Sequence, residues 1–133
     1  MSGWSLQYSF DVDLEHGIIY EKIFGIWKLA TAEEYHRDFM EEVQPLIEKP
    51  WAKLVDLTSW RTSYPEVIRK IGDHLKWCRL HNMQLSLNVL SNPSTFRQLN
   101  QMFASGGTKG QSHTFRTYAE AERYLKENWL KGK

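Results

Sequence analysis

The sequence predicts a single α/β domain over residues 1–133, with a mixed, mostly parallel five-stranded sheet that opens on an antiparallel hairpin. Two observations predict this class. Apolar and polar residues alternate at a period of two near the N-terminus, and strand-like segments then alternate with helix-like segments along the rest of the chain. Strands that are joined through helices pair in parallel by right-handed crossovers. A chain of 133 residues is long enough to bury one core.

The N-terminal hairpin is predicted from the clearest alternation in the chain. Apolar residues occupy every second position of the first strand, at Leu6, Tyr8, Phe10, Val12 and Leu14. Such alternation is typical of a half-buried strand. Gly17 suits the turn because glycine adopts a positive φ readily, and residues 18–26 then form the returning strand.

Four helices are predicted, each from a start signal. Thr31, Ser63 and Thr117 each precede a glutamate by three residues, which is the capping-box pattern. Asn92 is followed by a proline, the combination of an N-cap and a first-turn residue. A Gly-Gly pair at 106–107 ends the third helix. The four helices therefore begin near residues 31, 63, 92 and 117.

Three further strands are expected between the helices, over residues 52–58, 83–90 and 112–116. The polar residues of these strands indicate how the sheet is covered, because a strand with helices on both faces is apolar throughout. Here Lys53 interrupts one strand, and Ser86 and Asn88 alternate with apolar residues in the next. We therefore expect the four main helices mostly on one face of the sheet. The other face is expected to be polar or to be covered by something else.

Composition limits the cellular setting and the partners. The net charge is +1, so nothing favours nucleic acid or anionic lipid as a partner. Cys78 is the single cysteine, which excludes an internal disulfide and fits a reducing compartment. No apolar run approaches the roughly 18 residues of a membrane span, and the N-terminus lacks the features of a signal peptide. We expect a cytoplasmic protein.

Signatures of catalysis and of metal binding do not occur in recognisable form. The sequence contains no Gly-x-Ser-x-Gly elbow, no Cys-x-x-Cys pair and no His-Glu-x-x-His run. His74, Cys78 and His81 share one side of a helix, but a zinc site generally takes ligands from a second segment too. We therefore predict a non-enzymatic protein with no cofactor and no metal.

Four motifs, in this order, carry a resemblance to a known family. They are Phe24-Gly25-Ile26-Trp27, Thr31-Ala32-Glu33-Glu34, Leu54-Val55-Asp56-Leu57-Thr58 and the closing run from Thr117 to Leu125. The chain resembles the SpoIIAA-like proteins, relatives of STAS domains and of bacterial anti-sigma-factor antagonists, over nearly its whole length. The resemblance implies a βα superhelix with helices on one side and a role in protein interaction.

The resemblance also implies a candidate phospho-acceptor. In the antagonists, a partner kinase phosphorylates a serine at the start of the second helix, and the nearest matching position here is Ser63. The antagonists' Asp-Ser-Ser-Gly motif is replaced by Arg61-Thr62-Ser63-Tyr64. The residues on either side of Ser63 therefore differ from the family's pattern.

An anion site is the first candidate site. Asp56, Thr58, Ser59, Thr62 and Ser63 lie between the carboxyl end of a strand and the N-terminus of a helix. Ligands of open α/β sheets gather at such strand ends, and helix N-termini attract anions. The alternative is that Ser63 only caps the helix, which stabilises it by about 1 kcal/mol.

A partner surface is the second candidate site. Trp60 in its short loop either folds onto the core or is left for a partner. Trp77 and Leu80 fall away from the apolar stripe of the second helix, so another element covers them or they form a contact surface. The main hypothesis is a STAS-like protein-interaction or regulatory module, acting through the second helix and the loop before it on a protein partner or a second copy. The alternative is a carrier of a small anion or apolar ligand.

Overall fold

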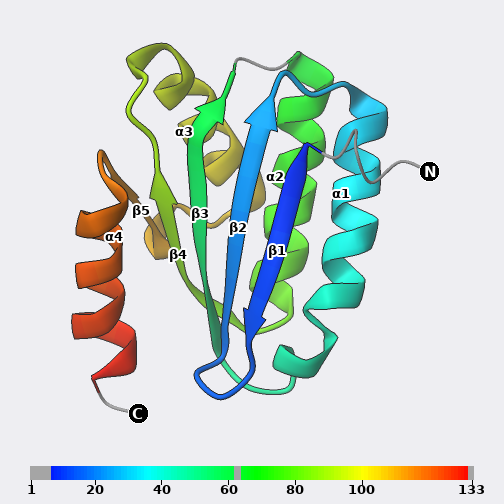
Figure 1. Cartoon of the computed structure of the whole chain (residues 1–133). Helices are drawn as coiled ribbons and strands as arrows, with labels where there is room; N and C mark the ends of the chain where they lie inside the picture. The colour runs from blue at the N-terminus through cyan, green and yellow to red at the C-terminus, as the bar shows by residue number, and fades with distance from the viewer. Residues whose placement is uncertain (1–6, 62–63, 132–133) are drawn as a thin grey trace.

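The computed structural model describes residues 7–61 and 64–131 of the chain. Its sheet contains five strands in sequential order (Figure 1): β1 (Tyr8–Asp13), β2 (Ile18–Gly25), β3 (Trp51–Trp60), β4 (Met83–Val89) and β5 (Ser112–Phe115). β1 pairs with β2 in the antiparallel sense, and every later pair is parallel. This arrangement confirms the predicted mixed sheet and its N-terminal hairpin.

Four main helices connect or follow the strands: α1 (Leu29–Glu42), α2 (Pro65–Leu80), α3 (Pro93–Gly106) and α4 (Tyr118–Leu125). Shorter helical turns are η2 (Gln44–Leu46), η3 (Lys109–Gln111) and the π-helical η4 (Lys126–Leu130). Within residues 7–61 and 64–131, no helix combines the length and the apolar character that crossing a bilayer requires.

The helices form two unequal layers on the sheet (Figure 1). Neighbouring residues of a strand point to opposite faces, and Ile18 and Ile19 of β2 illustrate this. Ile19 belongs to the larger core, which packs under α1, α2 and α3. Ile18 belongs to a second, smaller core that is closed by Ala121 and Leu125 of α4. Three of the four main helices therefore share one face, as predicted.

The polar residues of the central strands lie under the three-helix layer, and of the two alternatives for the other face, polar or covered, the structure has the covered one. Asn88 and Lys53 are buried on the side of the three-helix layer, while Leu87 and Val89 pack in the smaller core with α4. Burial of Asn88 is tolerated because its amide donates to Ser86 Oγ at 3.1 Å and to the His113 carbonyl at 3.3 Å.

Two of the predicted helix starts are confirmed in atomic detail. Asn92 Oδ1 accepts a hydrogen bond from the Ser94 amide at 3.0 Å. Thr117 Oγ1 accepts from the Glu120 amide at 3.2 Å, and the Glu120 carboxylate accepts from the Thr117 amide at the same distance. Both α3 and α4 therefore begin with a side-chain cap.

The other two start signals were misplaced. α1 begins at Leu29 with Lys28 as its N-cap, so Thr31 already lies in the first turn. Its hydroxyl donates to Gln7 Oε1 at 3.3 Å instead of capping the helix. α2 begins at Pro65 with Tyr64 as its N-cap and no side-chain cap. Ser63, the predicted cap, lies outside the described residues.

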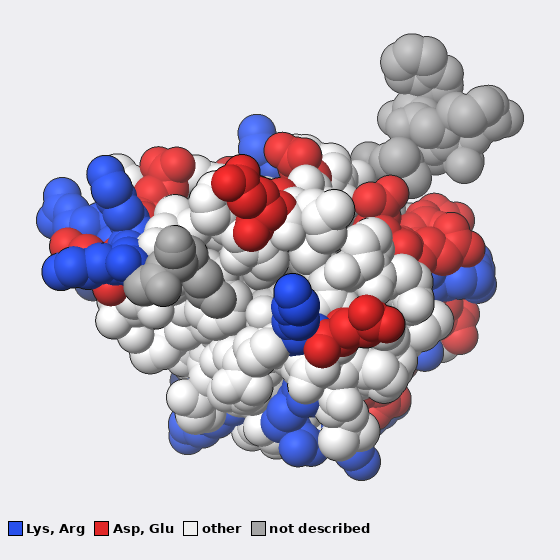
Figure 2. Space-filling model, turned by 90° about the horizontal axis from the view of Figure 1, so that it is seen from below, with Lys and Arg blue, Asp and Glu red and all other residues white. Residues whose placement is uncertain are grey.

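Charged side chains are unevenly spread over the end of the molecule seen in Figure 2. Basic side chains gather mainly at the left edge and below, and acidic ones lie along the top and right, with a mostly uncharged area between them. A nucleic-acid-binding face concentrates Lys and Arg in a patch or stripe. No continuous basic stripe crosses this face.

Candidate functional site

The predicted anion site lies at the carboxyl end of β3, which runs two residues further than expected. Asp56 Oδ1 accepts hydrogen bonds from the Thr58 amide at 3.0 Å and from the Thr58 hydroxyl at 2.6 Å. Thr58 and Ser59 are exposed. Thr62 and Ser63 lie outside the described residues. The described half of the site is therefore a local interaction along one strand, and anion binding there stays a prediction.

Trp60 is buried, with 5% of its surface exposed, because β3 contains a bulge. Lys22 pairs with Asp56 and Phe24 pairs with Ser59, so two steps along β2 match three steps along β3. An extra residue reverses which face the following side chains occupy. Trp60 consequently packs in the same core as Leu57. Of the two alternatives for this ring, folding onto the core describes the structure.

The two predicted contact residues on the outer face of α2 differ in how exposed they are. Trp77 is partly buried, and its ring stacks on His81 with centroids 4.2 Å apart. Leu80 is 62% exposed at the last position of the helix. The structure therefore leaves Leu80 open to a partner and covers Trp77 in part.

The candidate metal ligands of α2 and its C-cap are His74, Cys78 and His81, and their side chains do not converge on one point. Cys78 Sγ lies 3.6 Å from His74 Nε2. His81 Nδ1 lies 2.8 Å from the Trp77 carbonyl, so its ring is turned toward its own helix. Among the described residues, no group of three or more His, Cys, Asp or Glu side chains is placed to hold a metal ion.

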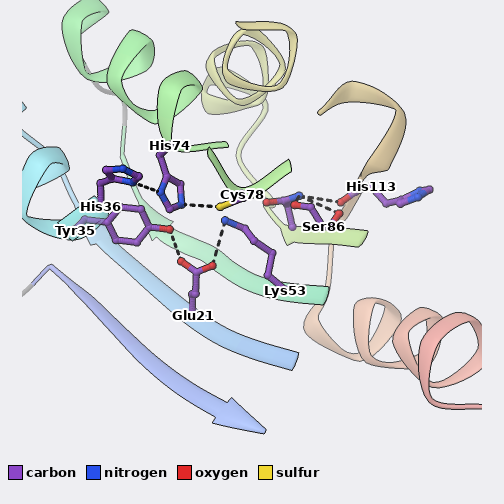
Figure 3. A network of polar contacts seen from close by, with 9 residues as sticks. Glu21, Tyr35, His36, Lys53, His74, Cys78, Ser86 and His113 are labelled. Carbon is purple, nitrogen blue, oxygen red and sulfur yellow. Dashed lines mark hydrogen bonds and ion pairs between the residues drawn. The ribbon is translucent and has the colours of Figure 1, made fainter. Parts of the chain in front are cut away.

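A cluster of polar side chains lies in the interior, between the sheet and the helices (Figure 3). Its centre is an ion pair in which Lys53 Nζ of β3 is 3.2 Å from Glu21 Oε2 of β2. The side chains of the two residues are 3% and 0% exposed. The Tyr35 hydroxyl of α1 donates a short hydrogen bond to the other oxygen of Glu21. Removing charges from water is costly, so a buried pair of this kind marks a candidate functional site.

Two histidines extend the cluster toward the surface. His74 of α2 is 1% exposed, and its Nδ1 lies 2.8 Å from Nδ1 of the partly exposed His36 of α1 (Figure 3). Burial, followed by the nearby charge of Lys53, holds the pKa of His74 well below its usual value of 6.5. Burial also lowers the pKa of His36. Both rings are neutral near pH 7, and one donates to the other.

The tyrosine of the cluster is fixed as a proton donor. Burial raises the pKa of the Tyr35 phenol well above 10, and the adjacent Glu21 carboxylate raises it further. The phenol therefore keeps its proton and holds the carboxylate in place. Lys53 Nζ also lies 5.2 Å from the centroid of the Phe39 ring, whose face attracts a cation.

A cavity of about 50 Å³ adjoins this cluster. Tyr35, Lys53, His74 and Asn88 form its polar side, and apolar side chains from the sheet and from α2 and α3 form the rest. Leu57 and Trp60 from the end of β3 and Val67 from the first turn of α2 place the cavity toward the carboxyl ends of the parallel strands. Open α/β sheets bind their ligands at such ends.

The fold has counterparts among solved structures. An anti-sigma factor antagonist from Mycobacterium paratuberculosis is similar with a TM-score of 0.59 and 14% identity, over 90% of this chain and 94% of that one. An uncharacterised protein of the DUF3478 family from Shewanella loihica PV-4, which has a SpoIIAA-like fold, is similar with a TM-score of 0.61 and 14% identity, over 89% and 91% of the two chains. The fold is SpoIIAA-like.

The SpoIIAA-like fold agrees with the resemblance that the motifs carry. No protein-family model matches the sequence, and no curated protein matches it either. At 14% identity the two structural neighbours establish the fold alone. The functional residues of this SpoIIAA-like chain must therefore be argued from its own geometry.

Sequence reasoning missed the interior cluster, although each charge in it was visible. Glu21 and Lys53 each stand inside a strand of otherwise mostly apolar residues. Taken singly, each resembles a residue on the solvent side of its strand. Their pairing depends on register: Lys53 is opposite Ile19, and Glu21 lies two residues further along the same face of β2. A search for opposite charges near the middle of neighbouring strands would have found this pair.

Proposed function

We propose that this chain is a non-enzymatic protein-interaction or regulatory module whose partner contacts the end of the sheet where the parallel strands finish. The observation that carries this proposal is the placement of exposed apolar side chains. Among the described residues, seven large apolar side chains are exposed, and five of them belong to this end: Phe24, Ile26, Leu29, Tyr64 and Phe96. We call these five residues the strand-end surface.

The strand-end surface is built from three neighbouring connections. Phe24 is the second-last residue of β2, Ile26 follows that strand, and Leu29 is the first residue of α1. Tyr64 precedes α2, and Phe96 lies in the first turn of α3. The Arg61 amide donates to the Gly25 carbonyl at 3.0 Å, which holds the ends of β2 and β3 side by side. Exposed apolar residues that occur singly need no explanation, but a group at one end is typical of an interaction site.

This proposal keeps the loop before α2 as a contact region and does not include the far end of that helix. The loop before α2 contributes through Tyr64, which is 51% exposed. Leu80 lies 16 residues further along the helix, or about 24 Å away at 1.5 Å per residue. Leu80 therefore belongs to a different contact region. The SpoIIAA-like fold, which an anti-sigma factor antagonist shares, supports a protein as the partner.

Phosphorylation of Ser63 remains a proposed means of regulation. Ser63 directly precedes Tyr64 in the sequence. A phosphate adds about two negative charges at neutral pH, which would oppose an apolar contact made by Tyr64. Mass spectrometry of the protein isolated from its own cells tests this proposal, and a chain without phosphate on Ser63 under all growth conditions would contradict it.

Charge substitutions within the strand-end surface test the proposal. Ile26→Asp and Tyr64→Asp place a charge in the surface, and Leu14→Asp is the matched control because Leu14 is 65% exposed in the turn that follows β1. Tagged wild type and variants are used to capture proteins from an extract of the source cells, with quantitative mass spectrometry. We expect one partner to be retained by wild type and Leu14→Asp and lost by the other two variants.

Two results would contradict the proposal. Equal capture by all four proteins would place the contact elsewhere, and loss with Leu14→Asp alone would place it at the opposite end. Circular dichroism confirms that each variant is folded. Sedimentation velocity distinguishes a second copy of the chain as the partner: in that case wild type is a dimer and Ile26→Asp is a monomer.

A further inference from the structure

The polar side of the interior cavity contains hydrogen-bond donors that the protein does not use. The Lys53 ammonium carries three N–H donors, and its side chain lines the cavity. Among the described residues, Glu21 is its only polar partner, at 3.2 Å. A buried donor without an acceptor is costly. Within the described part of the chain, Glu21 Oε2 has no hydrogen-bond partner, so the 3.2 Å contact is an ion pair, and the N–H donors of Lys53 remain available where its side chain lines the cavity.

The charge balance limits which acceptor can bind there. Glu21 already neutralises Lys53, and the pKa of His74 lies well below its usual value, so His74 adds no charge near pH 7. An anionic ligand would leave a net negative charge in the interior, at a large desolvation cost. A neutral ligand that offers an oxygen atom satisfies the donors without this cost.

We propose that this cavity is a binding site for a small neutral carbonyl compound, or for the carbonyl group of a larger apolar molecule. The carbonyl oxygen accepts a hydrogen bond from Lys53. The carbon skeleton packs against Val67, Leu99 and Met102, which belong to the apolar lining of the cavity. This inference goes beyond the proposed protein interaction and does not depend on it.

The size of the cavity sets the size of the probe. A dry cavity of about 150 Å³ accommodates benzene, so a cavity of about 50 Å³ holds a fragment of roughly two to four heavy atoms. Acetone has this size. Isobutene has the same shape without an acceptor oxygen, and acetate has the same shape with a negative charge. A comparison of these three molecules separates the contributions of the carbonyl group, the apolar skeleton and the charge to binding.

The lysine acts in this site as a hydrogen-bond donor. The Glu21 carboxylate and the face of the Phe39 ring both attract a cation at Nζ. An ammonium group has no free electron pair, so it binds a carbonyl oxygen without forming a bond to carbon. Exposed lysines are alkylated by this treatment, so peptide mapping is needed, and recovery of Lys53 itself unmodified after borohydride treatment with acetone agrees with this role. A reduced adduct on Lys53 would overturn it.

The experiment is a titration followed by methyl NMR spectra. Acetone, isobutene and acetate are each added to wild type, and the methyl signals of Val67, Leu99 and Met102 are monitored. We expect saturable shifts with acetone, whose affinity includes a contribution of about fivefold or more from one hydrogen bond to Lys53. Acetate is expected to bind about tenfold or more weakly than acetone, because burying its charge is unfavourable.

Variants assign the effect to Lys53. Lys53→Met is expected to weaken acetone binding by about fivefold or more and to leave isobutene binding unchanged. Lys22→Met is the matched control, since Lys22 is exposed on the opposite face of the neighbouring strand. If Lys53→Met does not fold, the double variant Glu21→Gln/Lys53→Met removes both charges together and replaces it.

Three results would overturn the proposal. Shifts that do not saturate show that the cavity does not bind these molecules. Equal acetone affinities of wild type and Lys53→Met show that Lys53 contributes no hydrogen bond. Acetate binding as tight as acetone binding shows that the site selects anions and that the charge argument is wrong.

Discussion

The ammonium of Lys53 and the carboxylate of Glu21 form a buried ion pair across two parallel strands, with an N–O distance of 3.2 Å. Each partner satisfies the charge of the other, so the loss of one is more harmful than the loss of both. This relationship makes the interior of the sheet sensitive to single substitutions and tolerant of matched ones.

We expect Lys53→Met to lower the free energy of unfolding by about 3–5 kcal/mol, because it leaves the Glu21 carboxylate buried without a counter-charge. The double variant Glu21→Gln/Lys53→Met is expected to cost much less. Urea denaturation of the wild type, both single variants and the double variant measures the coupling. Additive single effects would show that the pair is not coupled.

The stability of the protein is expected to depend on pH through His74. Its folded-state pKa is well below 6.5 because the ring is buried. The unfolded chain therefore binds more protons as the pH falls below about 6.5. Stability is complete above that pH and is lost progressively toward the lower folded-state pKa. His36, whose pKa is also lowered, acts in the same direction.

Urea denaturation at pH 7.5 and pH 5.5 measures this dependence, and His74→Gln is expected to reduce it. An independent check follows the His74 ring signals by NMR. A titration midpoint of His74 near 6.5 in the folded protein would show that burial does not suppress its protonation.

Cys78 is expected to be unreactive in the folded protein. The thiol is fully buried, and burial raises its pKa to about 12, so almost no thiolate is present at neutral pH. Reaction with a chromogenic disulfide is expected only after unfolding. Ser91→Cys adds a thiol at an exposed position and is expected to react with one equivalent at once. Rapid reaction of two equivalents in that folded variant would contradict the burial of Cys78.

Close contact between α2 and α3 is expected to require glycine at position 106. A Cβ atom there would lie 2.6 Å from the Gly72 carbonyl oxygen, so the two helices would have to separate. We expect Gly106→Ala to cost about 1–3 kcal/mol of stability, as overpacking does. Gly110→Ala is the control, because a Cβ atom there meets nothing within 4 Å. Thermal unfolding compares the two, and equal midpoints would contradict the close contact.

Most of the architecture could be predicted from local patterns. Period-two alternation identified the hairpin, and start signals such as Asn92 and Thr117 identified helices, because both depend on residues close together in the sequence. The side of the sheet that α4 covers could not be predicted this way. Its apolar residues fit either face, and the choice depends on Ile18, Leu54 and Leu87 presenting a second apolar surface.

The candidate site was harder to predict, for two physical reasons. The bulge in β3 turns Trp60 inward, and a bulge leaves no signal in the alternation before it. The Glu21–Lys53 pair depends on the register between two strands that are separated in sequence by a whole helix. For Leu80, helical periodicity left open whether another element covers it. It is 62% exposed, and its role in a partner contact stays a prediction.

The position of α4 has a consequence during synthesis. The apolar surface of Ile18, Leu54 and Leu87 is made early, but Ala121 and Leu125, which cover it, are translated much later. A nascent chain therefore carries β1 to β4 with one apolar face uncovered until α4 has been made. In that interval the growing chain is vulnerable to aggregation, and chaperones that recognise exposed apolar strands have their best opportunity to bind.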